Sequence, residues 1–313
     1  MASSGKIGVA LHEPGVAAQL AAIELAEQLG VARVWLTTAG VGPDALTLLA
    51  AAAVRTSHIG LGTAIVPVFP RHPLAVVQQV LVIAALAPGR LRLGVGPSHK
   101  PSVEGIFGIP FVRPLEYLRE YVAILRAALQ QGQFDFEGKR LLVRGTVPEP
   151  PQVPVLISAL RPGSYRLAGE ISDGALAWVC PLPYLRDHAL PALREGAAAA
   201  GRAAPPLVAH CFAVVHEDDQ AVRAAARERA AGYARLPFYQ EMFARAGYPE
   251  AREGTMSDAL LDEIVVHGDE ATVAARLKAY LEAGMDELIV SALVVGPDRH
   301  ASLERTLRLL GTL

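Results

Sequence analysis

The chain has 313 residues, of which 52% are hydrophobic, and its formal net charge at pH 7 is −2. This composition predicts a folded protein with a large core, and the scattered basic residues argue against nucleic acid or an anionic membrane surface as a partner. The two cysteines, Cys180 and Cys211, lack metal-like spacing, so neither a disulfide framework nor a metal site is expected. Residues 1–6 are too short and polar for a signal peptide, and no apolar run reaches the ~18 residues of a spanning helix, so we expect a cytoplasmic protein.

Short β-branched runs alternate with amphipathic helical patterns along the chain, which is typical of a parallel α/β fold. Strands are predicted at residues 7–11, 33–37, 59–66, 91–96, 155–158, 175–179, 207–215 and 287–293. Helices are predicted at residues 16–29, 43–54, 73–86, 114–130, 161–169, 182–200, 218–232, 267–284 and 298–310. Eight strand–helix units favour a single α/β domain, a closed (β/α)8 TIM-like barrel covering residues 1–313, over an open doubly wound sheet.

Insertions after strands 4 and 7 interrupt the regular spacing, at about residues 97–113, 131–152 and 233–263. The first is predicted to be an irregular loop, and the second is predicted to be a polar hairpin. The third is rich in aromatic residues and is open to three interpretations: a lid, a dimer surface or additional core. Insertions at the carboxyl ends of barrel strands are where substrate specificity is usually built.

Glycines take one face of two neighbouring predicted strands. Gly94 and Gly96 share a face of the fourth strand, and Gly60 and Gly62 share a face of the third. Faces without side chains predict that something large lies against them, and two such strands together predict a shelf for a cofactor. The sequence after Gly96 lacks the third glycine of a dinucleotide-binding turn, which argues against a Rossmann site.

Polar side chains follow several predicted strands, at the end of a barrel where active sites lie. They are His12, Thr37, Thr38, His72, His99, Ser158, Arg161, Ser164 and Trp178. His12 and His99 are open to both a catalytic and a structural interpretation, whereas His72 is expected to hold the loop after the third strand. The sequence has no Ser-His-Asp order and no His-Glu-x-x-His motif, so acyl transfer and zinc hydrolysis have no support.

Residues 158–164 combine a strand end, a flexible turn, a cation and the first turn of a helix. Free amides, the helix dipole and Arg161 would all favour a bound phosphate there. The alternative is an ordinary capped loop between a strand and a helix.

Several segments resemble the bacterial luciferase-like flavin and deazaflavin oxidoreductases. The resemblance rests on residues 26–35, 61–67 with 71–73, 89–96, 116–121 and 268–287. Residues 96–99 and the short segment 37–44 are most similar to the branch that uses the deazaflavin coenzyme F420. The resemblance implies a TIM-like barrel that binds coenzyme F420, or alternatively flavin mononucleotide (FMN), at its C-terminal face. Many relatives carry an acid or histidine where Thr37 and Thr38 stand, so no acid–base residue is transferred from the family.

The resemblance, together with the strand-end residues, gives a set of expected site residues. Those expected to be catalytic are His12, Thr37, His99 and Trp178. Those expected to bind the cofactor are Thr63, Ala64, Ile65, Gly94, Gly96, Ser98, His99, Ser158, Arg161, Gly163 and Ser164. The resemblance also implies a cis peptide bond between Ala64 and Ile65. His99, Lys100 and Arg113 are expected to form a flexible cationic rim for the anionic tail of coenzyme F420.

We therefore expect an oxidoreductase that transfers hydride between coenzyme F420 and a small organic substrate, with a homodimer as the expected assembly. The alternatives are an FMN-dependent monooxygenase, which would use the same shelf, and a binding protein without turnover. A phosphosugar isomerase is a further alternative, and the lack of a carboxylate base at a strand end counts against it.

Overall fold

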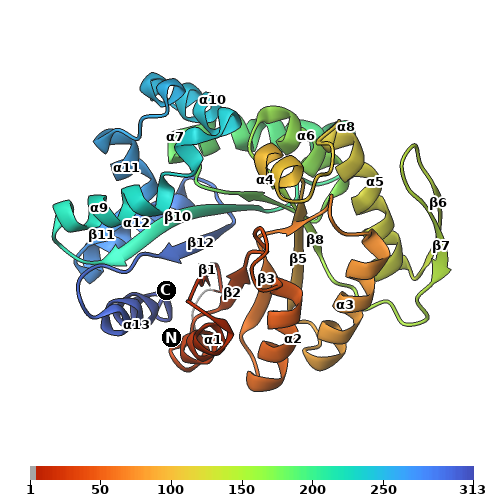
Figure 1. Cartoon of the computed structure of the whole chain (residues 1–313), viewed down its shortest axis with the longest axis horizontal. Coiled ribbons are helices and arrows are strands. Elements are labelled where there is room, and N and C mark those ends of the chain that lie inside the picture. Colours follow the sequence, from red (N-terminus) through yellow and green to blue (C-terminus); the bar gives the residue numbers. More distant parts are fainter. Residues whose placement is uncertain (1–4) are drawn as a thin grey trace.

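Eight parallel strands close into a barrel, which confirms the predicted fold (Figure 1). The computed structural model describes residues 5–313, so most of the segment considered above as a leader, residues 1–6, lies outside the described residues. The barrel strands are β1 (Ile7–Ala10), β2 (Arg33–Leu36), β3 (Gly60–Thr63), β5 (Leu91–Gly96), β8 (Val155–Ala159), β9 (Gly174–Ala177), β10 (Leu207–Val215) and β12 (Glu287–Ala292). Pairing of β10 with β9 and of β12 with β1 closes the ring.

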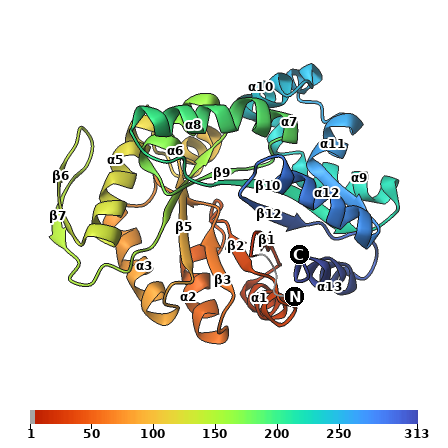
Figure 2. The ribbon, with the colours of Figure 1, turned by 180° about the vertical axis from the view of Figure 1, so that it is seen from behind.

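Helices surround the barrel, as the view from behind also shows (Figure 2). They include α1 (Val16–Gln28), α2 (Ala45–Arg55), α3 (Pro73–Leu86), α5 (Pro114–Arg126), α6 (Pro162–Ile171), α7 (Leu182–Tyr184), α8 (Leu190–Ala199), α9 (Asp219–Ala230), α12 (Glu270–Glu282) and α13 (Arg299–Leu310). Aspartates cap α2, α9, α12 and α13 by accepting hydrogen bonds from first-turn amides. The last helix returns beside α1, where a methyl group at Gly311 would lie 1.8 Å from the carbonyl oxygen of Leu29.

The first two insertions lie next to α5. Residues 131–152 form the predicted hairpin, in which β6 (Gln133–Glu137) pairs antiparallel with β7 (Leu142–Thr146). The buried carboxylate of Glu120 accepts hydrogen bonds from the amides of residues 139–141 and so anchors the hairpin to α5. The predicted irregular loop is partly wrong, because residues 97–113 include the helix α4 (Lys100–Gly105). This helix is too short to show a helical period in the sequence.

The third insertion is helical, and an additional strand follows it. It contains α10 (Pro237–Arg245) and α11 (Asp258–Ile264), with single turns at Tyr233–Arg235 and Pro249–Glu253. The prediction of a helix from residue 267 is wrong at its start, because β11 (Val265–Gly268) pairs parallel with the second half of β10. Gly268, with φ +131°, ends this strand, and Asp269 then caps α12.

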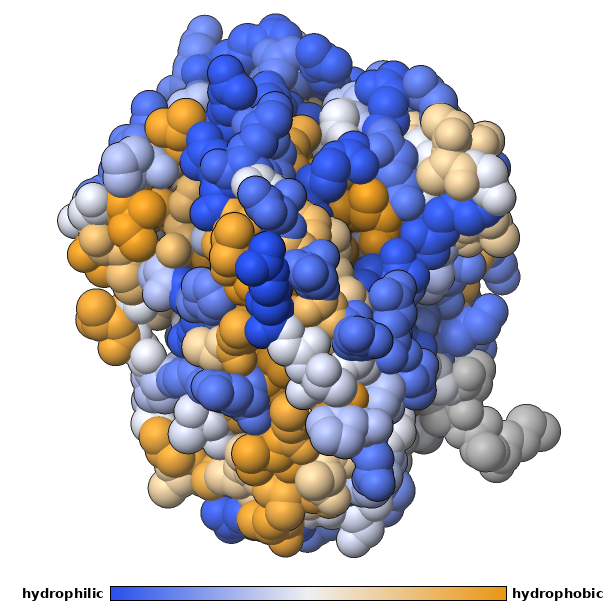
Figure 3. Space-filling view, turned by 90° about the vertical axis from the view of Figure 1, so that its right-hand side faces the viewer, coloured by the Kyte–Doolittle hydropathy of each residue, from blue (hydrophilic) through white to orange (hydrophobic). Residues whose placement is uncertain are grey.

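Exposed apolar side chains gather on the outer surface of α2 and α3. Val54, Val82 and Leu86 are 66%, 54% and 44% exposed. Figure 3 shows hydrophobic side chains in the lower part of the side of the molecule that carries α3. Within residues 5–313, no helix is long and apolar enough to cross a bilayer.

Candidate active site at the barrel mouth

The interior of the barrel is filled by a small apolar cluster of its own. Its members are Trp35, Ala64, Leu156, Leu176, Val208 and Ile289. Ala10, Ile65 and Trp178 pack against this cluster while remaining partly exposed. Since these three residues lie at or just after the carboxyl ends of β1, β3 and β9, they form the floor of the barrel mouth. We use "mouth" below for this floor and the strand ends around it.

The open glycine face that the sequence predicts is instead filled by protein. A methyl group at Gly62 would lie 2.4 Å from the Trp35 ring, and one at Gly60 would lie 2.6 Å from the guanidinium of Arg33. A methyl group at Gly94 would lie 2.0 Å from the carbonyl oxygen of Thr63. The shelf interpretation is therefore wrong, because these glycines allow close packing inside the barrel.

Gly96 and Ser158 face each other where β5 and β8 end. A methyl group at Gly96 would lie 2.0 Å from Ser158 Oγ and 3.2 Å from the side chain of Ile65. The next residue but one, Ser98, has φ +62° and turns the chain away from the strand. Cofactor contacts at Gly94, Gly96, Ser98 and Ser158 remain predictions.

The peptide bond between Ala64 and Ile65 is cis, as the resemblance implied. Thr37 Oγ1 donates a 2.7 Å hydrogen bond to the Ala64 carbonyl, and the Thr38 amide donates a 3.1 Å hydrogen bond to the Ile65 carbonyl. Thr63 Oγ1 donates to the Gly94 carbonyl and accepts from the Gly94 amide. The hydroxyls of Thr37 and Thr63 thus hold neighbouring strands together, and their expected catalytic and binding roles are still predictions.

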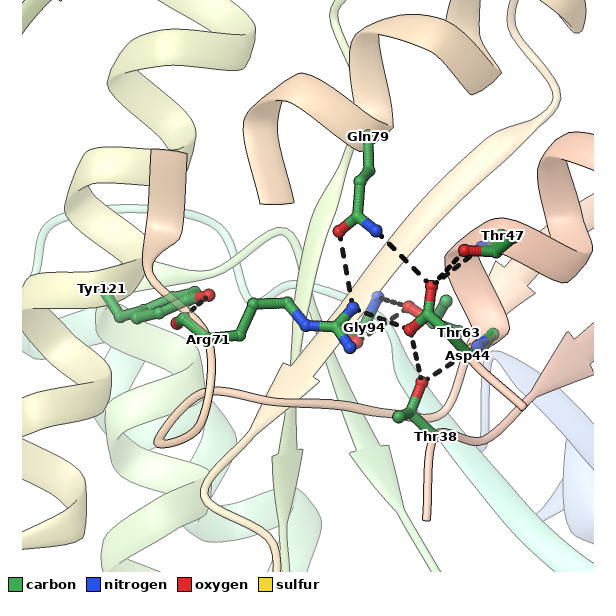
Figure 4. Close-up of polar contacts among 9 residues, drawn as sticks. Thr38, Asp44, Thr47, Thr63, Arg71, Gln79, Gly94 and Tyr121 are labelled. Atoms are coloured by element: carbon green, nitrogen blue, oxygen red, sulfur yellow. Dashed lines mark hydrogen bonds and ion pairs between the residues drawn. The ribbon is translucent and has the colours of Figure 1, made fainter. Parts of the chain in front are cut away.

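The loops that follow β2 and β3 are joined by an ion pair (Figure 4). Arg71 donates a 2.7 Å hydrogen bond to Asp44, and the Thr47 amide donates to the same carboxylate. Partial burial opposes ionisation of Asp44, but the bonds from Thr47 and Arg71 outweigh it and lower the pKa of this carboxyl below its usual value. The Arg71 carbonyl also accepts from the Tyr121 hydroxyl. Asp44 is therefore a structural carboxylate and is not available as a general base.

Three histidines follow barrel strands in the sequence. His72 caps α3 by accepting a 3.2 Å hydrogen bond from the Leu74 amide, so its predicted structural role is confirmed. The pKa of His12, an exposed side chain, is lowered by partial desolvation and by the charge of Arg229. Burial also lowers the pKa of His99. His12 and His99 are therefore biased towards the neutral imidazole at neutral pH.

Aromatic side chains of the third insertion reach the mouth. Trp178 Nε1 donates a 2.7 Å hydrogen bond to the Tyr233 hydroxyl. The Tyr233 ring lies 4.9 Å from that of Tyr239, which in turn contacts His99 edge-on at 5.8 Å. The Trp178 ring also stacks on His210 with ring centroids 3.7 Å apart. Sequence reasoning missed His210, because a histidine in the middle of a strand resembles any other core position.

At the predicted phosphate site, some backbone amides are already used within the loop, whereas the cation is unpaired in the part of the chain that the structure describes. Ser164 Oγ accepts hydrogen bonds from the amides of Leu160 and Arg161. Contrary to the prediction, neither of these amides is free to bind a phosphate. Among residues 5–313 the Arg161 guanidinium has no ion pair, and it lies 4.3 Å from the Phe238 ring. The amide of Gly163 lies in the first turn of α6, where no intrahelical acceptor exists. Arg161 and Gly163 are the groups that could bind an anion here.

Two side chains of the expected cationic rim form ion pairs with nearby carboxylates, and the role of the rim stays a prediction. Lys100 lies 3.8 Å from the carboxylate of Glu104, and Arg113 lies 3.4 Å from that of Glu116. By contrast, Arg229 is exposed and has no ion pair within the described part of the chain. It lies in the last turn of α9, four residues before Tyr233, and sequence analysis did not single it out.

A closed parallel barrel with polar groups at the carboxyl ends of its strands defines the class of TIM-barrel enzymes. The sequence model of the luciferase-like monooxygenase family matches residues 1–287, and the chain belongs to this family. The chain is therefore an oxidoreductase enzyme, and the alternatives of a binding protein without turnover and of an isomerase are not supported.

Several proteins are similar to the chain over nearly their whole length. The F420-dependent glucose-6-phosphate dehydrogenase of Beutenbergia cavernae is 31% identical over 294 residues, covering 86% of this chain and 85% of that protein. An F420-dependent secondary alcohol dehydrogenase in complex with an F420-acetone adduct has a similar fold, with a TM-score of 0.83, 19% identity and coverages of 99% and 98%. The FMN-bound oxygenating constituent of the 3,6-diketocamphane monooxygenase of Pseudomonas putida gives a TM-score of 0.72, 20% identity and coverages of 99% and 97%.

Proposed function

We propose that this protein transfers a hydride between coenzyme F420 and a small organic substrate bound at the barrel mouth. The observation that carries the proposal is the Arg161 guanidinium, which lacks an ion pair among the described residues and lies at the first turn of α6. A cation beside the amide of Gly163 in the first turn of α6 fits the phosphate group that both candidate cofactors carry. The F420-dependent relative from Beutenbergia cavernae supports the choice of coenzyme F420.

In this proposal the chain binds and orients the two reactants and keeps water away from them. Arg161 and the Gly163 amide hold the phosphate, and Ile65 supports the cofactor on the floor of the mouth. When bound, the reduced deazaflavin would supply the hydride. Because Asp44 is tied to Arg71, the neutral imidazoles of His12 and His99 are the candidates for moving the accompanying proton.

An FMN-dependent monooxygenase is the second candidate. FMN ends at its phosphate and needs no open exit for a tail, and the FMN-bound neighbour shows that this fold accommodates it. With Lys100 and Arg113 already paired, the structure gives less support to a dedicated site for the F420 tail than the sequence did. The homodimer expected from the sequence is retained as part of the proposal.

Side-by-side fluorescence titrations with coenzyme F420 and with FMN test the proposal. We expect tighter binding of coenzyme F420 at low ionic strength, with the preference weakening as salt rises. The opposite order of affinities would move the assignment to the FMN-dependent monooxygenases. The absorbance of the cofactor that co-purifies from a host making both compounds gives an independent answer.

An Arg161→Ala variant tests the anion site itself, and Arg144→Ala is its matched control. Arg144 lies on β7 of the hairpin and is not among the expected site residues, and its exposed side chain pairs with that of Asp135. Loss of affinity for both cofactors in Arg161→Ala but not in Arg144→Ala supports the site. Equal affinities in the two variants would remove Arg161 from it.

A further inference from the structure

His210 is buried in the middle of β10 and bridges three strands of the barrel. Its side chain is 1% exposed. Nδ1 accepts a 3.2 Å hydrogen bond from the amide of Val179, just after β9, and Nε2 lies 2.8 Å from Ser291 Oγ on β12. Because Nδ1 accepts from an amide, Nε2 carries the ring proton and donates it to Ser291.

The same imidazole supports Trp178 and the backbone next to it. The rings of His210 and Trp178 are nearly parallel, at 21°, with centroids 3.7 Å apart. Val179 has φ +53°, a conformation that a β-branched residue rarely adopts, and its amide is held by His210. On its outer edge, Trp178 is held by the hydrogen bond from Nε1 to Tyr233. Trp178 is thus restrained both through its ring face and through its ring nitrogen.

The surroundings of His210 do not suit a group that exchanges protons. Both of its ring nitrogens have protein partners within the described chain. Burial, and to a smaller degree the charge of Arg229, lowers its pKa to about 3. Tyr233, the titratable group on the far side of Trp178, has its pKa raised by burial and so stays a neutral phenol. A fixed, neutral ring is suited to holding its neighbours in place.

We propose that His210 is a positioning residue, which fixes the indole of Trp178 on the floor of the mouth before any ligand arrives. Trp178 and Ile65 pack on the same inner cluster, so the orientation of the indole shapes the surface on which cofactor and substrate would lie. The inference rests on the proposed function in one respect: that the mouth is the binding site. The order of Trp178 in the ligand-free protein can be measured without that assumption.

The chain has two tryptophans, Trp35 and Trp178, so the emission of Trp178 is the difference between a protein and its Trp178→Phe counterpart. Two substitutions separate the contacts of His210. His210→Phe keeps a ring for the stack but loses both hydrogen bonds, whereas His210→Asn keeps an acceptor near the Nδ1 position but loses the ring. Tyr233→Phe removes only the outer hydrogen bond of Trp178, so it measures separately what that bond contributes to holding the indole.

Time-resolved fluorescence anisotropy of the ligand-free protein is the first measurement. We expect Trp178 to move mainly with the whole molecule, and the amplitude of its fast local motion to rise about twofold or more in both His210 variants and in Tyr233→Phe. Arg144→Ala is the control and should leave this amplitude unchanged. An unchanged amplitude in whichever His210 variant folds would overturn the proposal, and Tyr233→Phe shows how much of the restraint comes from the outer hydrogen bond.

Titration with coenzyme F420 and with FMN is the second measurement. Loss of a buried hydrogen-bonded support predicts about tenfold weaker binding in His210→Asn. A variant whose Trp178 is loosened but which binds as the parent does would show that His210 has a purely structural role. If the parent protein binds neither cofactor, the proposed function fails, and the anisotropy alone then decides whether His210 fixes Trp178.

Discussion

Replacing Gly94 by alanine tests why this strand carries glycine. If the glycine made room for a cofactor, the substitution would leave the ligand-free protein as stable as before and would weaken cofactor binding. If the glycine makes room for the protein itself, the ligand-free protein must lose stability. The structure supports the second explanation, because a methyl group at Gly94 would lie 2.0 Å from the Thr63 carbonyl oxygen and 2.5 Å from the Leu176 side chain.

The expected loss follows from which atoms are in the way. The Thr63 oxygen belongs to the backbone of β3 and cannot rotate away, so Gly94→Ala should cost ~3 kcal/mol, the upper end of the range for overpacked cores. At Gly96 the nearest atom is the hydroxyl of Ser158, which can rotate, so Gly96→Ala should cost only ~1 kcal/mol. Removing that hydroxyl in Gly96→Ala/Ser158→Ala should recover part of the loss.

Urea denaturation of the cofactor-free variants measures these differences. Gly105→Ala is the matched control, because it lies in α4 with no atom within 4 Å of the added methyl group and should be neutral or slightly stabilising. The packing argument would be refuted if Gly94→Ala unfolded at the same urea concentration as the parent. An unchanged midpoint combined with lost cofactor affinity would restore the shelf interpretation.

Three further substitutions test single contacts. Arg161→Ala should weaken cofactor binding by ~1.5–3 kcal/mol in a titration, with an unchanged thermal midpoint of the cofactor-free protein. Glu27→Ala should cost ~1–2 kcal/mol at pH 7, because Glu27 accepts hydrogen bonds from the amides of residues 57–59. Those bonds outweigh its desolvation and lower the pKa of Glu27 in the folded state. The stability difference between Glu27→Ala and the parent should therefore be complete above the unfolded-state pKa of ~4.3. In urea melts, this difference should disappear as the pH falls through the folded-state pKa. Arg229→Gln should raise the pKa of His12 in an NMR titration, because the charge of Arg229 lowers it. An unchanged pKa of His12 would show that Arg229 does not lie close enough to act on it.

The barrel was predictable because its signals are repetitive. β-Branched runs, helical periods and punctuating Pro and Gly recur eight times, so one misread element leaves the architecture unchanged. Two of the elements that the sequence did not show, α4 and β11, have six and four residues and are too short for a period to emerge. α4 lies in the first insertion and β11 directly follows the third, where no repeated unit constrains their length.

The position of the candidate site was predictable from the sequence, but the hydrogen-bond partners of its residues were not. Parallel strands place their carboxyl ends together, so residues such as Thr37 and Trp178 could be assigned to the mouth from chain order alone. Which of their atoms are already used could not be assigned, since the Thr37 hydroxyl is bound to a carbonyl 27 residues away. For the same reason the glycines indicated a missing side chain, without showing whether protein or ligand takes its place.

The packing of the third insertion bears on whether it is a lid, a dimer surface or additional core. Tyr239 and Phe243 are buried, so this segment is core in part. Two of its other aromatic residues reach expected site residues: Tyr233 binds Trp178, and Phe238 covers Arg161. The insertion therefore restrains both sides of the mouth at once, the expected cofactor anchor and the indole beside it. Changes within it should alter what the mouth binds while the strand-built floor beneath stays the same.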